Sequence, residues 1–152
     1  MQDDKICYDV CTSQNVDDVA KLALKLWNDA DYDELKDEFE AILQTESNIV
    51  YTAYCQEKMI AFAHCSLRSE YVEGADSDNV AYLEGIFVQQ QFRNCGIASR
   101  LIQCCEHWAK VKGCRQFASD CEINNLPSIS LHKKYGFNES AKLVHFIKNI
   151  GG

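Results

Sequence analysis

The residue types most suited to binding and chemistry gather in the segment Phe87–Leu101, FVQQQFRNCGIASRL. A strand is predicted to end at the start of this segment, a polar loop carrying Arg93 and Gly96 follows, and a helix begins near Ile97. Free backbone N–H groups and the positive end of the helix dipole therefore converge on one point, which favours binding of a phosphate group. Gly96 lets backbone approach the anion closely. An ordinary strand-to-helix connection is the alternative, because the segment matches neither the P-loop nor the G-x-G-x-x-G dinucleotide pattern.

Two carboxylates lie close to predicted strand ends. Glu84 is on the strand that leads into the phosphate-binding loop, and Asp120 ends a later predicted strand. A carboxylate at such a place can hold an ammonium group and accept a proton from it, directly or through a water molecule. The alternative for each is a carboxylate that simply faces solvent.

Hydrophobic spacing predicts the elements that must position these residues. It switches repeatedly between the strand and the helix period and gives the order βααβββαβαβ, an α+β or α/β domain built on one mixed sheet. The predicted strands span residues 6–12, 48–55, 59–71, 81–88, 114–120 and 141–150, and the predicted helices span 16–27, 32–44, 97–113 and 127–134. A three-residue turn at 56–58 joins the strands of a hairpin. No repeat or Pro/Gly-rich linker is present, so residues 1–152 are predicted to form a single domain.

Composition narrows the class of protein further. The chain has 152 residues, 47% of them hydrophobic, and no apolar run reaches the ~18 residues that a membrane span needs. The first twenty residues hold five Asp and no apolar signal segment, so a cytoplasmic protein is expected. The nine cysteines are scattered and include no C-x-x-C pair, which favours small buried apolar residues over a disulfide framework or a zinc site. No metal is expected.

The charge is distributed unevenly along the chain. Residues 1–90 hold 19 Asp and Glu against 6 Lys and Arg, whereas residues 91–152 hold 4 against 9. The acidic part attracts cations and repels phosphate, which argues against nucleic acid as a partner, and the basic part suits an anionic cofactor. Surface charge kept for solubility is the alternative.

Several of these strings resemble a known family. Arg93-x-x-Gly96-x-Ala98, directly after LEGIFV, looks like the acetyl-CoA pyrophosphate motif of the GNAT superfamily of N-acetyltransferases, and the later NNLPSISLHKKYGF resembles that family's short helix before a Gly-Phe turn. SEYVEG, YLEGIFV, FASD and the closing VHFIKNI are similar to the aminoglycoside 6′-N-acetyltransferases of bacterial resistance. The resemblance implies a GNAT-type single mixed, mostly antiparallel sheet flanked by helices, acetyl-CoA as co-substrate, and a homodimer.

The resemblance also implies roles for individual residues. It places Glu84 and Asp120 at a gap between two splayed strands that holds the acetyl group, and the backbone N–H near Val88 against the thioester carbonyl, where it would stabilise developing negative charge. The residues it assigns to acetyl-CoA binding are Phe87, Val88, Arg93, Asn94, Gly96, Ile97, Ala98, Ser99, Asn125 and His132.

Two of these assignments remain open at the level of sequence. His132 stands where many family members have a Tyr that protonates the departing thiolate. The imidazole could supply that proton or serve only in packing or cofactor contact, and the thiolate could also leave unassisted, because a thiol has a pKa near ~8.5. Asn125 matches a family Asn that hydrogen-bonds the pantetheine arm, and a helix cap is its alternative.

Binding of the amine substrate is expected in the acidic part of the chain. Trp27 lies among Asp29, Asp31 and Asp33, and a flat aromatic ring beside carboxylates suits a sugar that carries ammonium groups. Tyr71 and Glu73 resemble the wall of the substrate pocket in the aminoglycoside enzymes. Core packing for the aromatic residues and an ordinary loop charge for Glu73 are the alternatives.

Three functions follow from these features. The first is acetyl transfer from acetyl-CoA to the 6′-amine of aminoglycosides by direct attack. The second is acetylation of another cationic amine, such as a polyamine, a peptide N-terminus or a protein lysine, because a fold does not fix its substrate. The third is an acyl-CoA-binding module without catalysis, against which the intact carboxylates Glu84 and Asp120 argue.

Overall fold

The computed structural model describes residues 5–68, 80–121, 124–142, 144 and 146–151. Its elements, in chain order, are β1 (Ile6–Val10), α1 (Val16–Leu26), α2 (Tyr32–Ile42), β2 (Asn48–Cys55), β3 (Lys58–Arg68), β4 (Val80–Val88), the short 3-10 helix η1 (Gln90–Phe92), α3 (Ile97–Val111), β5 (Gln116–Ser119) and α4 (Leu126–Lys134). No helix among these residues is long and apolar enough to cross a membrane.

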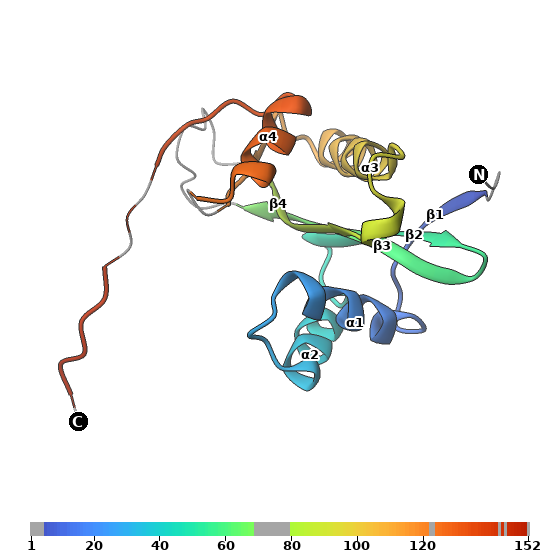
Figure 1. Cartoon of the computed structure of the whole chain (residues 1–152), viewed down its shortest axis with the longest axis horizontal. Helices are drawn as coiled ribbons and strands as arrows, with labels where there is room; N and C mark the ends of the chain where they lie inside the picture. The colour runs from blue at the N-terminus through green and yellow to red at the C-terminus, as the bar shows by residue number, and fades with distance from the viewer. Residues whose placement is uncertain (1–4, 69–79, 122–123, 143, 145, 152) are drawn as a thin grey trace.

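The five strands form one sheet in the order β1-β2-β3-β4-β5. The pairs β1–β2, β2–β3 and β3–β4 are antiparallel, and β4 and β5 are parallel. Figure 1 shows α1 and α2 on one side of the sheet and α3 and α4 on the other. The predicted mixed, mostly antiparallel sheet flanked by helices is therefore confirmed.

The hairpin between β2 and β3 is tighter than predicted. Cys55 pairs with Lys58, so the turn has two residues instead of three. Both turn residues, Gln56 and Glu57, have positive φ, 51° and 68°. Two successive left-handed residues match the right-handed twist of the flanking strands, which is why such turns join hairpins.

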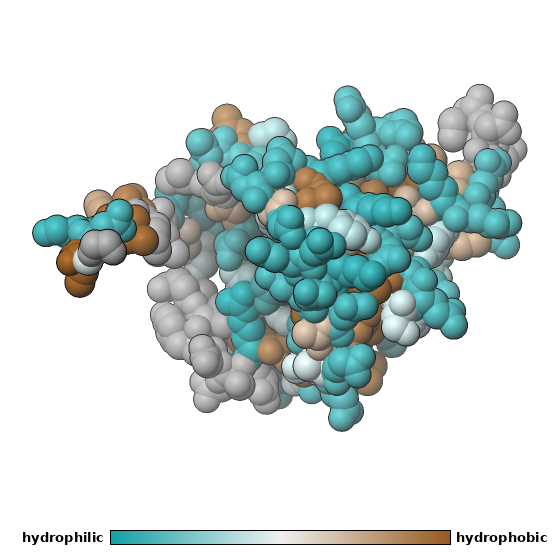
Figure 2. Space-filling model, turned by 90° about the horizontal axis from the view of Figure 1, so that it is seen from below, coloured by the Kyte–Doolittle hydropathy of each residue, from teal (hydrophilic) through white to brown (hydrophobic). Residues whose placement is uncertain are grey.

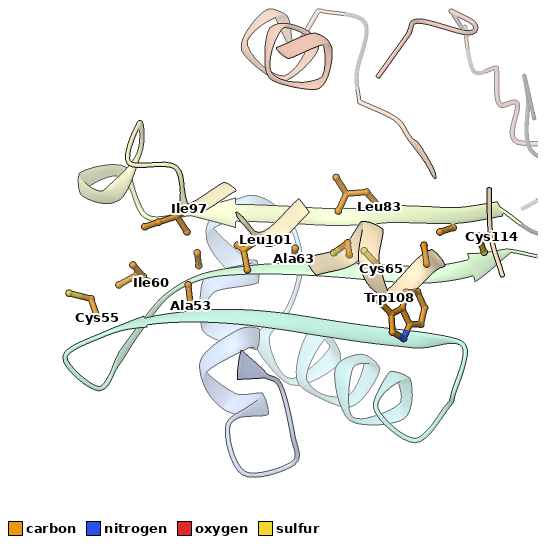
Figure 3. Close-up of a cluster of buried hydrophobic side chains, with 14 residues drawn as sticks. Ala53, Cys55, Ile60, Ala63, Cys65, Leu83, Ile97, Leu101, Trp108 and Cys114 are labelled. Carbon is orange, nitrogen blue, oxygen red and sulfur yellow. The ribbon is translucent and has the colours of Figure 1, made fainter. Parts of the chain in front are cut away.

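The main core lies between the sheet and α3. Ile97, Leu101, Cys105 and Trp108 recur on one face of the helix and are buried. Figure 3 shows Leu101 beside Ala63 of β3, with Ile97 and Trp108 toward opposite ends of the same cluster. Five of the nine cysteines are buried, as the scattered pattern predicted: Cys11, Cys55, Cys65, Cys105 and Cys114.

A β-bulge interrupts β4 in its middle. His64 of β3 faces Gly85 and the next residue, Cys65, faces Leu83, so Glu84 is an extra residue in the ladder. A bulge leaves one residue unpaired, bends its strand and increases the local twist, and bulges are frequent beside active sites. The candidate acid–base residue thus occupies the irregular position of the central sheet.

The closing strand predicted over residues 141–150 is wrong for this chain taken alone. The described residues of the C-terminal tail (residues 141–151) form no strand, and Figure 1 shows the tail running away from the body. Its large apolar side chains are exposed: Val144 73%, Phe146 86%, Ile147 86% and Ile150 91%. The β-forming side chains of the tail favour a strand, but a strand also needs a hydrogen-bonding edge beside it, and no described strand pairs with the tail.

Candidate active site

The parallel strands β4 and β5 separate at the centre of the site. Their pairing runs from Val80 and Gln116 to Leu83 and Ser119, where β5 ends. We call the point beyond this last pair, where the two strands separate, the fork. β4 continues alone to Val88, and the bulge at Glu84 bends it directly after the last pair. Glu84 and Asp120 are consequently the first residues beyond the fork, which is where the family resemblance placed them.

The Glu84 carboxylate is ionised, and hydrogen bonds fix its orientation. Ser66 Oγ donates to its Oε2 at 2.5 Å, and Arg68 donates from Nη2 to Oε1 at 2.8 Å and from Nε to Oε2 at 3.1 Å. Burial raises the pKa of Glu84, but the hydrogen bonds and charge of Arg68 together with the Ser66 bond outweigh it and hold the pKa below its usual range. The site therefore favours Glu84 as a fixed negative charge that binds a cation or orients a water molecule.

Asp120 is joined to this cluster through Tyr82. The Tyr82 hydroxyl donates a hydrogen bond to Asp120 Oδ2, and the Arg68 guanidinium stacks 3.5 Å above the centre of the Tyr82 ring. Burial, followed by the bond to Asp120, raises the pKa of Tyr82, so the phenol keeps its proton as a donor. Arg68 and Tyr82 thus connect the two predicted carboxylates, a link that strand-end position alone could not reveal.

An acidic and aromatic pocket opens beside the fork on the side of α1 and α2. Its volume is about 350 Å³. Trp27, Ala30, Glu34, Leu35, Glu38, Phe39, Ile42, His64 and Glu84 line it. Figure 2, which views the molecule from that side, shows a largely hydrophilic surface over these helices. The pocket offers three carboxylates and an indole ring to a ligand, which suits a compact polycation.

Trp27 reaches the pocket because β4 has a glycine beneath it. The ring lies so close to Gly85 that a Cβ there would meet Trp27 Cη2 at 2.6 Å. Trp27 follows the last residue of α1 and stays 37% exposed, with its ring tilted against Phe62 at a centroid distance of 6.5 Å. The predicted aromatic wall is therefore present, although its carboxylates come from α2 and β4.

His64 forms part of the pocket wall as a neutral base. Its Nε2 lies 2.8 Å from Asn48 Oδ1, and Asn48 donates from Nδ2 to Thr45 Oγ1 at 2.9 Å. The amide oxygen can only accept, so Nε2 carries the ring proton and Nδ1 is left as an acceptor. Burial lowers the pKa of His64, with the charge of Glu84 opposing the shift. Sequence analysis did not single out His64, because a single His in an apolar strand most often packs in the core.

The predicted phosphate-binding loop has the backbone geometry expected of it. Gly96 sits at the N-cap of α3 with φ 84°, Asn94 is also left-handed at φ 62°, and no side chain caps the helix. The N–H groups of the first turn therefore have no intrahelical or side-chain partner. Arg93 donates from Nε to the Val88 carbonyl at 2.9 Å, which ties the loop to the end of β4.

The other predicted cofactor residues are brought to the same end of the sheet. Ile97 is 2% exposed, so only its backbone can reach a ligand, whereas Ala98 and Ser99 are half-buried on the first turn of α3. Phe87 and Val88 are half-buried at the end of β4 and pack on opposite core clusters. Because Val88 lies beyond the fork, its backbone remains the predicted partner of a thioester carbonyl.

α4 brings His132 to the fork from the other side of the sheet. His132 Nε2 lies 2.8 Å from Ser119 Oγ, and Nδ1 lies 2.7 Å from the Ser128 carbonyl oxygen. Asn125 caps the same helix by accepting from Ser128 N at 3.2 Å, which is the structural role considered for it from sequence. Its contact with a cofactor remains a prediction.

The remaining residues predicted to bind the substrate differ in where they lie. Tyr71 and Glu73 lie outside the described residues. Glu34 and Glu38 were not singled out in the acidic run of α2, although their spacing of four places them on one helix face. Asp31 instead caps α2, accepting from Glu34 N at 3.1 Å. Among the described residues, no cluster of three or more His, Cys, Asp or Glu could hold a metal ion.

A mixed sheet with a bulged central strand, a fork beside it and an uncapped helix following a glycine loop is the arrangement of an acyl-CoA-dependent acetyltransferase. Residues 13–137 match the model of the acetyltransferase (GNAT) family. The chain belongs to this family.

Individual relatives share nearly the whole chain. The aminoglycoside N(6′)-acetyltransferase type 1 of Acinetobacter genomosp. 13 is 41% identical over 127 residues, 83% of this chain and 86% of that protein. The solved structure of aminoglycoside N-acetyltransferase AAC(6′)-Iy in complex with CoA has a TM-score of 0.92 and 32% identity, covering 98% of both chains. The same enzyme with a bisubstrate analogue, CoA-S-monomethyl-acetylneamine, has a TM-score of 0.90 and covers 96% of this chain and 99% of that chain.

Proposed function

We propose that this protein transfers the acetyl group of acetyl-CoA to the 6′-amine of aminoglycosides, and so confers resistance to them. The observation that carries the proposal is the acidic, aromatic pocket that opens directly at the fork between β4 and β5. A polycationic sugar matches its carboxylates, and its position delivers an amine to the place where the family's thioester lies. Curated relatives with this activity span most of the chain, which supports the same assignment.

Direct attack requires a neutral amine held against the thioester carbonyl. Glu84 and Asp120 supply negative charge on the pocket side of the fork, and we assign them to binding the ammonium group and to receiving its proton, for Glu84 through a water molecule. The held position of Glu84 suits this role, because Arg68 and Ser66 fix its orientation. The backbone N–H of Val88 is assigned to the carbonyl oxygen as it gains charge.

Acetyl-CoA is assigned to the opposite end of β4. The first turn of α3 presents its free N–H groups to the pyrophosphate, with Gly96 and Asn94 shaping the loop and Arg93 holding it against Val88. Asn125 and His132 on α4 are assigned to the pantetheine arm. The net positive charge of residues 91–152 favours this anionic co-substrate.

The test is acetyl transfer by the purified protein to kanamycin, tobramycin, spermidine and a lysine-rich peptide, followed by mass spectrometry of the products. Product mass is preferable to free-thiol detection, because the chain itself carries nine cysteines. Acetylation of the antibiotics at the 6′-amine is expected. Activity only on spermidine or the peptide would move the function to another cationic amine, and acetyl-CoA binding without any product would leave a binding module.

Matched variants on α2 connect the activity to the pocket. Glu34→Gln and Glu38→Gln should each raise the KM for kanamycin about five-fold, because an exposed charge pair contributes up to ~1 kcal/mol. Asp37→Asn is the control, since Asp37 lies on the same helix and does not line the pocket. Equal KM values for all three variants would place the aminoglycoside elsewhere.

We also propose that the protein works as a cytoplasmic homodimer, without nucleic acid or membrane as partners. The apolar C-terminal tail supports the dimer, because a chain in isolation leaves Phe146 and Ile147 in water. The tail is rich in β-forming residues such as Val144, Phe146 and Ile147, and β5 is an edge strand of the described sheet, so a second copy offers the tail a place to pair. Net acidity argues against phosphate-rich partners.

A further inference from the structure

The contact between Ser119 and His132 has a defined direction of hydrogen bonding. His132 Nδ1 faces the Ser128 carbonyl at 2.7 Å, and a carbonyl can only accept, so Nδ1 carries a proton. The neutral ring therefore accepts at Nε2. The single proton of the Ser119 hydroxyl has two acceptors within reach of Oγ, His132 Nε2 at 2.8 Å and the Leu83 carbonyl oxygen at 3.3 Å, and the shorter contact favours donation to Nε2. When the ring is protonated, both nitrogens donate, and the Ser119 and Ser128 oxygens both can accept. The setting thus accommodates the neutral and the charged ring without movement.

Ser119 stands on the face of the fork opposite Glu84. Phe117, two residues earlier in β5, packs against the core under α3, so Ser119 points toward that same side of the sheet. Ala118 packs with Tyr82 on the other side, where Tyr82 also binds Asp120. The fork therefore has carboxylates on its pocket side and a hydroxyl backed by an imidazole on its α3 side.

His132 is positioned behind Ser119. Within the described part of the chain, the groups in contact with its ring are Ser128 of the same helix, Ser119 of β5 and Phe137, whose ring meets it edge-on at a centroid distance of 5.2 Å. None of these groups titrates near neutral pH. The nearest carboxylate along β5, Asp120, is engaged by Tyr82 on the opposite face.

We propose that Ser119 is the catalytic residue that protonates the departing CoA thiolate, and that His132 is a positioning residue that resupplies the proton through Ser119. This inference rests on the proposed acetyl transfer. An amine that enters from the pocket side meets the carboxylates, and a thiolate that leaves toward the α3 side meets Ser119. Each reactant therefore reaches the group that its proton transfer requires.

The proton balance of the step is complete. As the amine forms its bond to the acetyl carbon, the carbon–sulfur bond breaks and its electron pair stays on sulfur. The Ser119 O–H bond breaks and an S–H bond forms, while Ser119 Oγ takes the proton of the imidazolium Nε2. The amine loses its proton on the carboxylate side of the fork, to Asp120 or through a water molecule to Glu84, and His132 regains one from solvent after CoA departs.

The kinetic test compares Ser119→Ala, His132→Gln and the double variant with the full-length wild-type enzyme on kanamycin. Ser119→Ala should lower kcat at least ten-fold, with both KM values within about two-fold, since an acid–base group typically contributes ~10² to 10⁴. The double variant should be no worse than either single variant, because the two act in one relay. Ser119→Thr, which keeps the hydroxyl, should recover part of the rate. Ser130→Ala, at an exposed position of α4, is the control.

The pH profile distinguishes a relay from a structural role. Wild-type kcat should depend on pH through the relay, with a limb on which kcat falls toward alkaline pH, and this limb should be absent in both single variants. A limb that persists in Ser119→Ala and disappears in His132→Gln would overturn the proposal, because His132 would then act directly. A rate for Ser119→Ala within three-fold of wild type would also overturn it.

A second measurement does not depend on any amine. CoA labelled with ¹³C beside its sulfur reports the ionisation of the bound thiol by NMR. Donation from Ser119 to the thiolate should lower the pKa of bound CoA, and Ser119→Ala should raise it again. If the wild type binds CoA but acetylates none of the amines, this titration still decides the role of Ser119. An unchanged thiol pKa in the variant would overturn the contact.

Discussion

Substituting Gly85 by alanine tests the link between the sheet and the substrate pocket. The new Cβ would lie 2.6 Å from Trp27 Cη2, 2.9 Å from Cζ2 and 3.5 Å from Leu26 Cδ2. Contacts below about 3 Å cannot persist, so the indole ring must move. Overpacking of this kind costs ~1–3 kcal/mol. Trp27 is 37% exposed and can swing outward, so we expect the cost to appear mainly in substrate binding.

The expected loss of kanamycin affinity is about 30-fold, which corresponds to ~2 kcal/mol, the middle of a range of roughly 5- to 150-fold that follows from 1.4 kcal/mol per factor of ten. Isothermal titration calorimetry measures it, with acetyl-CoA affinity as the internal reference because α3 lies on the other side of the sheet. Gly151→Ala is the matched control, since a Cβ there meets nothing within 4 Å.

A double-mutant cycle decides whether the clash is the cause. In a Trp27→Leu background the ring is gone, so adding Gly85→Ala should cost far less affinity than it does in the wild type. Equal losses in both backgrounds, or an unchanged affinity of the single Gly85→Ala variant, would refute the reasoning.

Three further perturbations have expected outcomes. Folding lowers the pKa of Glu84, so its ionised form stabilises the folded protein at pH values above about 4.5, its ordinary pKa, and this stabilisation is lost as the pH falls through the lowered pKa. The thermal unfolding temperatures of the wild type and of Glu84→Gln should therefore differ near neutral pH and converge in acid. Gly96→Ala forces a Cβ into φ 84°, at a cost of roughly 1–2 kcal/mol, and should weaken acetyl-CoA binding about ten-fold by calorimetry while kanamycin binding persists. Replacing Phe146 and Ile147 together by serine should turn a sedimenting dimer into a monomer, whereas Lys148→Ser should not; a dimer that survives the double change would remove the tail from the interface.

Local patterns predicted most of the fold. The spacing of apolar residues in α3 and the β-formers of β2 each reflect a single element meeting a single core, so sequence alone was sufficient. The prediction of a strand in the tail was wrong because a strand forms only against a partner edge, and a local pattern holds no information about such an edge. The β4 bulge was also missed, although Glu84 and Gly85 interrupt the apolar residues of this strand and a glycine inside a strand is a sign of a bulge.

The candidate site divides in the same way. Gly96 and Glu84 could be found because a loop before a helix and the strand leading into it have local signatures. Arg68, Tyr82 and Ser119 could not, because each acts on a residue at least 13 positions away through the register of the sheet or the docking of α4. Glu34 and Glu38 carried a usable signal, their shared helix face, which an acidic run obscured.

The bulge makes Glu84 dispensable to the architecture that carries it. Ala81 and Leu83 before it, and Ile86 and Val88 after it, all belong to the core beneath α3, although odd numbers precede the bulge and even numbers follow it. A chain lacking this one residue would keep the same inward and outward faces and a more regular ladder. Folding and chemistry are therefore separable at this position. Deleting Glu84 alone should straighten β4, extend its pairing with β5 and close the fork. The result should be a well-folded protein without a catalytic gap.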